Sequence, residues 1–390
     1  MNEFMRARGG FVSVLSLVLL ALALSLPKLR DPVPTKGGTD SLFYRAQVYE
    51  LRGKSRADAL QKVFTSDAAR RIASVVPQLR NPKWVRFSSR FYRRRWLVPL
   101  VAAPLPLNVD RSVIWASILG YALLGPLLFA LLRMRFSEPL SLAAAAACLV
   151  LPPVHGWAAA AMTDSWGLTL EVAAMVAVLL AFRDGGKWIA AWAAAMLALS
   201  FTRDASLVLL AGVALILALS TRTRRGILIL VTGTAASVPA IALFGAPLVQ
   251  QLSWAMQGFN IPHPASWSYV RSHLPGQMRS VLHKDAIYPG ELTFHLIWYA
   301  VGVVLLAAVA YMVVRAPWRE PYYLLQRGAL VGGSALLLLA AYYTHMRLEL
   351  AFVPVVAVSL AFAAELGVTS IRRRRAWQPR TPGASLRRVP

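Results

Sequence analysis

The chain has 390 residues, of which 57% are hydrophobic and only 15% are charged. Soluble proteins carry about a quarter charged residues, so this composition and the repeated long apolar runs exclude a soluble enzyme, a disordered protein and a collagen-like chain. The net charge of +25 does not require a nucleic-acid partner, because basic loops beside lipid phosphates explain such an excess in a membrane protein. The single cysteine, Cys148, lies in an apolar run and allows no intrachain disulfide and no thiolate metal site.

Apolar runs of membrane-spanning length recur along the chain. A helix needs about 20 apolar residues to cross a bilayer, where no water satisfies an open backbone. The first run follows two arginines and is similar to a signal peptide, but because nine more runs follow we expect a retained first helix. We predict an all-α polytopic domain over 1–366 with ten transmembrane helices, at 10–26, 111–132, 139–153, 165–182, 187–201, 205–220, 226–246, 294–314, 323–343 and 349–366.

The short loops between these runs predict the orientation. With the N-terminus inside, the inner loops hold most of the short-loop Arg and Lys, whereas the short outer turns hold only Arg203 and Arg347. The positive-inside rule then places both termini in the cytoplasm, and two long loops, 27–110 and 247–293, outside. We therefore expect a multi-pass protein of the cell membrane, with a basic and disordered cytoplasmic tail at 367–390.

The first outer loop has the pattern of a folded, partly helical segment. Residues 40–52 contain no Gly or Pro and end at Gly53, which predicts a helix. A capping box at 55–58 opens a second helix whose apolar face continues to about residue 76. The basic, aromatic stretch at 86–107 predicts an interfacial helix that lies along the headgroups, with its arginines at phosphate level.

Ionisable side chains are scarce and gather on the predicted outer side. Asp40 stands at the start of the first loop helix, and Asp164 opens the run at 165–182 within TDSWGL. Arg203 and Asp204 separate two runs within FTRDASL. An Asp at a helix start could simply cap the helix, and Arg203 could simply pair with the neighbouring Asp204.

Two further ionisable residues bear on the same question. Arg347 opens the last run within MRLEL and could pair with Glu349 nearby. Charged groups at membrane depth are usually functional, so both Arg203 and Arg347 are candidate anion ligands. Glu171 lies two turns after Asp164 on the same helix face, and we expect it to pair within the bundle.

Several chemistries lack their usual motifs. The chain contains no HExxH, no DxD and no histidine pair at helical spacing, which argues against a metal site. It contains no GxxxxGKS or GxGxxG phosphate loop, and no GxSxG elbow of a serine hydrolase. We therefore expect no cofactor and no divalent metal.

Taken together, the layout resembles the GT-C superfamily of integral-membrane glycosyltransferases, which use polyprenyl-phosphate-linked sugars at the outer membrane face. TDSLFYRAQVYELRG looks like the segment that holds the catalytic base of this family, and RRRWLVPLVAAPL looks like its basic interfacial segment. TDSWGL and FTRDASL resemble its polar breaks between paired spans, and MRLELAFVPVV resembles its arginine at the start of a late span. The paired acidic motif of metal-dependent members is missing, which favours a metal-free member.

The resemblance implies inverting transfer of a sugar, for which we favour mannose, from a polyprenyl-phosphate donor to a lipid or glycan acceptor. One carboxylate would take the proton of the acceptor hydroxyl, and cations would hold the leaving phosphate. We expect Asp40 as the base, with Asp31 in reserve. The expected phosphate ligands are Arg94, Arg95, Arg203 and Arg347, and the expected substrate-binding residues are Tyr44, Asp164, Asp204, His345 and Trp267.

Two alternatives stay open. A polymerase or ligase of lipid-linked glycans would also use outer arginines, but with a diphosphate lipid that carries an oligosaccharide. A transporter or flippase would place ionisable residues at the membrane midplane and show paired repeats. Apart from the substrates, the only expected partners are anionic membrane lipids.

Overall fold

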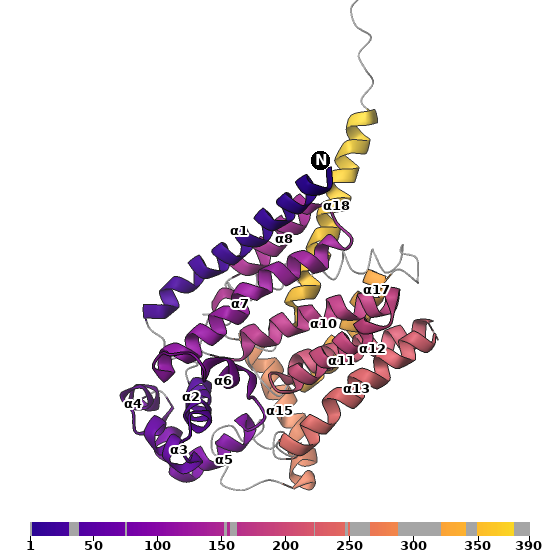
Figure 1. Ribbon diagram of the computed structural model, residues 1–390. Coiled ribbons are helices and arrows are strands. Elements are labelled where there is room, and N and C mark those ends of the chain that lie inside the picture. The colour runs from indigo at the N-terminus through magenta and orange to yellow at the C-terminus, as the bar shows by residue number, and fades with distance from the viewer. Residues whose placement is uncertain are drawn as a thin grey trace, which may run out of the picture.

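The computed structural model describes residues 2–30, 39–74, 76–151, 154–156, 162–221, 223–245, 249, 266–287, 321–340 and 349–377. Within these ranges every regular element is a helix (Figure 1), so the predicted all-helical class is confirmed for this part of the chain. Four stretches are long and apolar enough to cross a membrane: Gly10–Arg30, Val109–Arg133, Asp164–Asp184 and Arg224–Phe244. Four shorter apolar helical stretches accompany them, at Glu138–Val150, Lys187–Ser200, Ser206–Ser220 and Val353–Glu365.

The long helices agree with the predicted apolar runs in order but not always in extent. The predicted run at 294–314 lies outside the described residues, and ten spans stay a prediction. The helices are α1 (Asn2–Arg30), α7 (Val109–Arg133), α8 (Glu138–Val150), α10 (Asp164–Asp184), α11 (Lys187–Ser200), α12 (Asp204–Thr221), α13 (Arg224–Phe244), α17 (Pro321–Ala340) and α18 (Val353–Trp377).

The expected disordered tail is wrong in its first part. Helix α18 continues to Trp377, well beyond the predicted end of the last run at residue 366. The added segment contains no Pro and carries four arginines, at 372–375, close to its end at Trp377. Arginine is a good helix former, and positive charge is favourable at a helix C-terminus.

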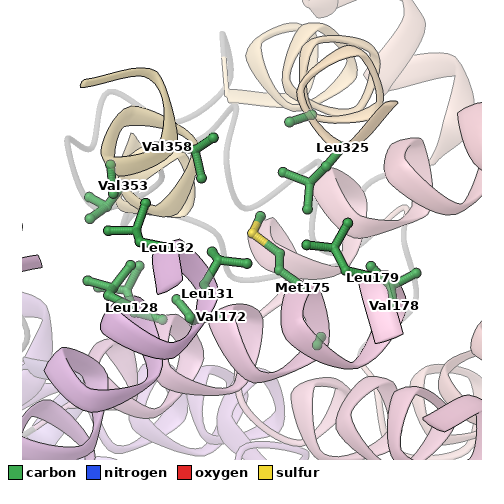
Figure 2. Close-up of a cluster of buried hydrophobic side chains, with 14 of the residues drawn as sticks. Leu128, Leu131, Leu132, Val172, Met175, Val178, Leu179, Leu325, Val353 and Val358 are labelled. Atoms are coloured by element: carbon green, nitrogen blue, oxygen red, sulfur yellow. The ribbon is translucent and has the colours of Figure 1, made fainter. Parts of the chain in front are cut away.

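The core of the bundle lies where α7, α10, α17 and α18 meet. Helix α10 contacts α7 on one side and α11 on the other. Most of its residues between Asp164 and Ala181 are buried, as is typical of a helix that other helices enclose. Figure 2 shows this cluster, whose labelled members are almost fully buried: Leu128, Leu131, Leu132, Val172, Met175, Val178, Leu179, Leu325, Val353 and Val358.

Helices α12 and α17 cross at glycines, and their backbones nearly touch. A Cβ atom on Gly212 would lie 2.4 Å from the backbone N of Gly332 and 2.5 Å from the carbonyl O of Gly328. Small residues permit such close crossings between membrane helices. This contact fixes the position of α12, at whose start Arg203 and Asp204 lie.

Large apolar side chains are exposed on α1 and α13. Phe11 on α1 is 68% exposed and Leu243 on α13 is 78% exposed. On α1 the exposed Phe11, Leu15 and Leu19 share one helix face, and an apolar surface of this kind is rare on soluble monomers. It suits contact with lipid and agrees with a membrane protein.

Between α1 and α7 the chain forms a separate group of short helices, here called the α2–α6 unit (residues 39–102), which lies at one end of the molecule in Figure 1. It has its own apolar core, which includes the buried Phe43, Ile72 and Val98 and continues onto the first half of α7. Its helices are α2 (Thr39–Leu51), α3 (Arg56–Phe64), α4 (Asp67–Ala73), the 3-10 helix η1 (Pro77–Arg80), α5 (Pro82–Tyr92) and α6 (Leu97–Ala102).

Two predicted helices of this unit are each split. The predicted cap at 55–58 is confirmed, since Ser55 Oγ accepts a bond from the Asp58 backbone N at 3.2 Å. Helix α3 nevertheless ends at Phe64, because Thr65 and Ser66 bond back to carbonyls of that helix. Ser66 then caps α4.

The single interfacial helix predicted over 86–107 is also wrong. Helix α5 ends at Tyr92, and α6 begins at Leu97. The physical reason is Pro99, whose nitrogen carries no hydrogen to bond the carbonyl of Arg95 in a continuous helix.

The basic short loops gather at the end of the bundle away from the α2–α6 unit. Arg135, after α7, forms an ion pair of 3.1 Å with Glu365 of α18. Arg225, at the start of α13, donates a bond of 2.8 Å to the carbonyl of Arg183 near the end of α10. Each contact joins segments that are predicted to face the cytoplasm, while the side that they face stays a prediction.

Candidate functional site

Asp40 lies in the first turn of α2, at the junction of the α2–α6 unit with the bundle. Helix α2 contains no Gly or Pro, and residues 41–48 are all buried. A helix enclosed on every side over two turns is held rigidly by its neighbours. The carboxylate of Asp40 is therefore presented from a fixed backbone, near the helix N-terminus, where negative charge is favourable.

Tyr92, the last residue of α5, contacts Asp40 directly. Its hydroxyl donates a hydrogen bond of 2.6 Å to Oδ1 of Asp40. Its ring stacks on Phe43 at 4.3 Å between centroids and meets the ring of Tyr44 edge-on at 5.7 Å. Burial, and then the nearby Asp40 carboxylate, raise the pKa of Tyr92 well above its ordinary value. The phenol therefore stays protonated and remains a donor to the carboxylate.

Tyr44 connects the α2–α6 unit to the membrane helices. Its hydroxyl lies 3.3 Å from the hydroxyl of Thr163, which directly precedes α10. Both side chains are buried, and a buried hydroxyl is costly unless it is bonded. The start of α2 is thus tied to the start of α10.

Asp164 and Arg203 form a buried ion pair between two helices. The Arg203 guanidinium lies 2.5 Å from Oδ1 of Asp164, and their side chains are 9% and 1% exposed. Gly167 makes room for this arginine, because a Cβ there would lie only 3.2 Å from Cδ of Arg203. Asp164 therefore has a partner outside its own helix, and Arg203 has a buried partner besides its sequence neighbour. A pair between Arg203 and Asp204 stays a prediction, because the side chain of Asp204 lies outside the described residues. The cap position of α10 is Thr163.

Glu171 adds a further buried polar contact between α10 and α12, deeper in the bundle than the pair of Asp164 and Arg203. It is fully buried, and its Oε2 accepts a hydrogen bond of 2.5 Å from the hydroxyl of Ser206 on α12. Ser206 lies one turn after Arg203, so the same two helices are bridged twice. The expectation that Glu171 pairs inside the bundle is confirmed.

The two predicted arginines of the basic stretch are less exposed than its other arginines, and one of them, Arg95, contacts the same network. Arg94 is only 4% exposed, which is less than expected of a residue at phosphate level. Arg95 places its guanidinium carbon 5.5 Å from the centre of the Tyr92 ring, in a cation–π contact. The exposed arginines of the stretch are Arg86, Arg90 and Arg93.

The structure thus brings together Asp40, Tyr44, Asp164 and Arg203, with Arg95 adjacent through Tyr92. Trp267, at the start of α15 (Trp267–Ile287), is 49% exposed and is not a member of this network. Asp31, His345 and Arg347 lie outside the described residues, as does the side chain of Asp204.

The sequence analysis missed Tyr92 and Thr163. Tyr92 is 52 positions from Asp40, and Thr163 is 119 positions from Tyr44. No periodicity or motif links such distant residues. The sequence held one weak signal for Thr163, which directly precedes the candidate Asp164 within the polar segment TDSWGL.

No three His, Cys, Asp or Glu side chains lie together as a metal site among the residues that the structure describes. Independence from metal stays a prediction. Comparison with models of known protein families gives no match, and comparison with curated proteins gives none either.

Proposed function

We propose that this protein is an integral-membrane glycosyltransferase. It would move a sugar, for which we favour mannose, from a polyprenyl-phosphate donor to a hydroxyl of a lipid or glycan acceptor at the outer face of the cell membrane. The observation that carries the proposal is the unbroken set of contacts from Asp40 through Tyr92 and Tyr44 to the buried pair of Asp164 and Arg203. This set links the Asp40 carboxylate of the α2–α6 unit to a buried cation of the apolar helix bundle, with the last step through Thr163, the chain neighbour of Asp164.

The reaction needs both kinds of group. The acceptor oxygen forms a bond to the anomeric carbon as the bond from that carbon to the phosphate oxygen breaks. The proton of the acceptor hydroxyl passes to a carboxylate, and the phosphate leaves with the electron pair of the broken bond. Fixed cations stabilise the charge that develops on this phosphate.

In this proposal Asp40 takes the proton, and Tyr92 holds its carboxylate in place. Arg203 and Arg95 contribute positive charge toward the lipid phosphate. A guanidinium carries five N–H donors, more than a single carboxylate accepts, so pairing with Asp164 is compatible with a phosphate contact. Asp164 would orient Arg203 rather than react.

The direct test is transfer of radiolabelled mannose from polyprenyl-phosphate-mannose in membranes that contain the full chain. Asp40→Asn keeps the shape of the side chain but removes the base, so transfer should fall by roughly 10²–10⁴-fold. Asp58→Asn changes an exposed carboxylate of the same unit and should leave transfer within twofold, as a rough margin for variants of equal yield.

Three results would change the proposal. Loss of transfer in Asp31→Asn with normal transfer in Asp40→Asn would move the base to Asp31. Transfer only from a diphosphate-linked oligosaccharide would favour the polymerase or ligase alternative. Wild-type protein that transfers from neither donor would remove the enzymatic proposal.

The transporter alternative has one observation of its own. Glu171 is a fully buried carboxylate within the bundle, bonded only to Ser206 among the contacts described above, and buried carboxylates are typical of ion and proton pathways. If transport is the function, Glu171→Gln should abolish movement of a labelled lipid or solute across proteoliposomes, whereas Asp40→Asn should not.

A further inference from the structure

A small pocket opens in the α2–α6 unit beside the Asp40–Tyr92 contact. Among the residues that line it are Phe43, Gln47, Glu50, Arg56, Tyr92 and Trp96. Helix α2 supplies three of them at helical spacing, and Asp40 stands three residues before Phe43. Residues at this spacing share one helix face, so the α2 residues that line the pocket lie on the same face of the helix as the proposed base. At about 1.5 Å per residue, Glu50 is about 15 Å along the helix from Asp40.

Gln47 presents an acceptor that the described part of the protein does not use. The side chain is only 6% exposed, and its Nε2 donates a bond of 2.7 Å to the carbonyl of Tyr92. Because a carbonyl can only accept, this bond settles which end of the amide faces Tyr92. The Oε1 has no hydrogen-bond partner among the described residues. Such a buried acceptor is unfavourable unless a ligand or water satisfies it.

Charges of opposite sign face the same pocket. Glu50 is half-buried, and burial raises the pKa of its carboxyl, against the opposing effects of Arg56 and Arg93. Arg56 donates a bond of 3.1 Å to the hydroxyl of Ser89 on α5, which holds its guanidinium at the wall.

This set of groups selects a ligand class. Glu50 disfavours a phosphate or another anion, and Arg56 disfavours a cation. A purely apolar ligand would leave the amide and both charges without partners, which is costly. A neutral ring that bears hydroxyls can place one of them in the pocket, where it can donate to Glu50 or Gln47 and accept from Arg56, and can rest its apolar face on the partly exposed Trp96.

We propose that this pocket binds the hydroxyl-bearing edge of one sugar ring, that of the acceptor. The role as an acceptor subsite rests on the proposed glycosyltransferase function, whereas carbohydrate binding can be tested without it. The free volume of the pocket is about 10 Å³, which is room for one water-sized group. One hydroxyl of the ring would therefore enter the pocket, and the rest of the acceptor would stay outside it.

Binding is measured by saturation-transfer NMR with methyl α-mannopyranoside and the full chain in lipid nanodiscs. Wild-type protein should transfer saturation to the glycoside but not to cyclohexanol, an apolar ring of similar size. Glu50→Gln and, independently, Arg56→Gln should weaken binding by roughly tenfold or more, because each removes a charged hydrogen-bond partner. Asp67→Asn, on an exposed carboxylate of the same unit, should bind like wild type.

Equal saturation of cyclohexanol and the glycoside, or unchanged binding by both pocket variants, would overturn the inference. In the transfer assay Glu50→Gln should raise the KM for acceptor and leave the KM for donor unchanged. If Glu50→Gln is active and its KM for acceptor is unchanged, the acceptor-binding role of the pocket is wrong, but the proposed function is not contradicted. If the protein binds the glycoside in a way that depends on Glu50 but has no transferase activity, the proposed function is wrong, but carbohydrate binding by the pocket is not contradicted.

Discussion

The hydroxyl of Tyr92 donates a hydrogen bond of 2.6 Å to Oδ1 of Asp40 and joins the end of α5 to the start of α2. This length is typical of a phenol bonded to an ionised carboxylate, which is among the stronger hydrogen bonds in proteins. The ring of Tyr92 is fixed in turn by stacking on Phe43. Tyr92 therefore acts as a positioning residue for the proposed base.

Tyr92→Phe keeps the stacked ring and removes only this bond. Hydrogen bonds to charged groups contribute about 1.5–3 kcal/mol, so transfer should fall by roughly 10–150-fold if Asp40 is the base. Tyr49→Phe, on the same helix as Asp40, is the control and should retain activity. In a double variant with Asp40→Asn the Tyr92 change should add little, because two residues that act as one unit are not additive. Independent, additive losses would contradict this role.

The buried pair of Asp164 and Arg203 predicts a double-mutant cycle. Removing one partner of a buried ion pair leaves an uncompensated charge and costs about 3–5 kcal/mol. Arg203→Gln and Asp164→Asn should therefore each lower the midpoint of thermal unfolding in detergent, while the double variant should recover much of the loss.

In the same variants, the dependence of transfer on the donor distinguishes a structural role of Arg203 from a role in phosphate binding. If Arg203 also holds the lipid phosphate, the double variant should remain at least about tenfold weaker in its use of polyprenyl-phosphate donor. A double variant with wild-type stability and wild-type donor dependence would make Arg203 purely structural.

Glu50 predicts a pH-dependent change in stability. Burial raises the pKa of its carboxyl in the folded state above the ordinary value of 4.5, so the folded protein holds this proton more tightly than the unfolded chain. Ionisation of Glu50 therefore destabilises the fold as pH rises from 4.5 through the raised pKa. Glu50→Gln should be more stable than wild type at neutral pH and lose this advantage near pH 4. An advantage that does not change between these pH values would contradict the assignment.

Sidedness is tested by cysteine labelling in a Cys148→Ala background. Lys83 in the α2–α6 unit and Ser266 before α15 are exposed, and so is Arg224 at the start of α13. Cysteines at 83 and 266 should react with a membrane-impermeant thiol reagent added from outside, and a cysteine at 224 should react only after permeabilisation. Outside labelling at 224 would reverse the orientation and move the candidate site to the inner face.

The sequence by itself determined the features that depend on local physics. Long apolar runs predict helices because a backbone in lipid must satisfy its own hydrogen bonds, and those helices are present throughout the described residues. The cap at Ser55 follows from a side chain three residues from its partner. The position of Asp40 at the start of a helix was predicted in the same way.

Only the tertiary structure decided which polar groups meet. From sequence the nearest anion to Arg203 is Asp204, but the chain folds so that α10 and α12 pack together and Arg203 pairs with Asp164, which is 39 positions away. Tyr92 and Asp40 meet because Phe43 and other buried residues give the α2–α6 unit a common core. These contacts join residues far apart in the chain, and long-range packing, which local propensity does not encode, selects them.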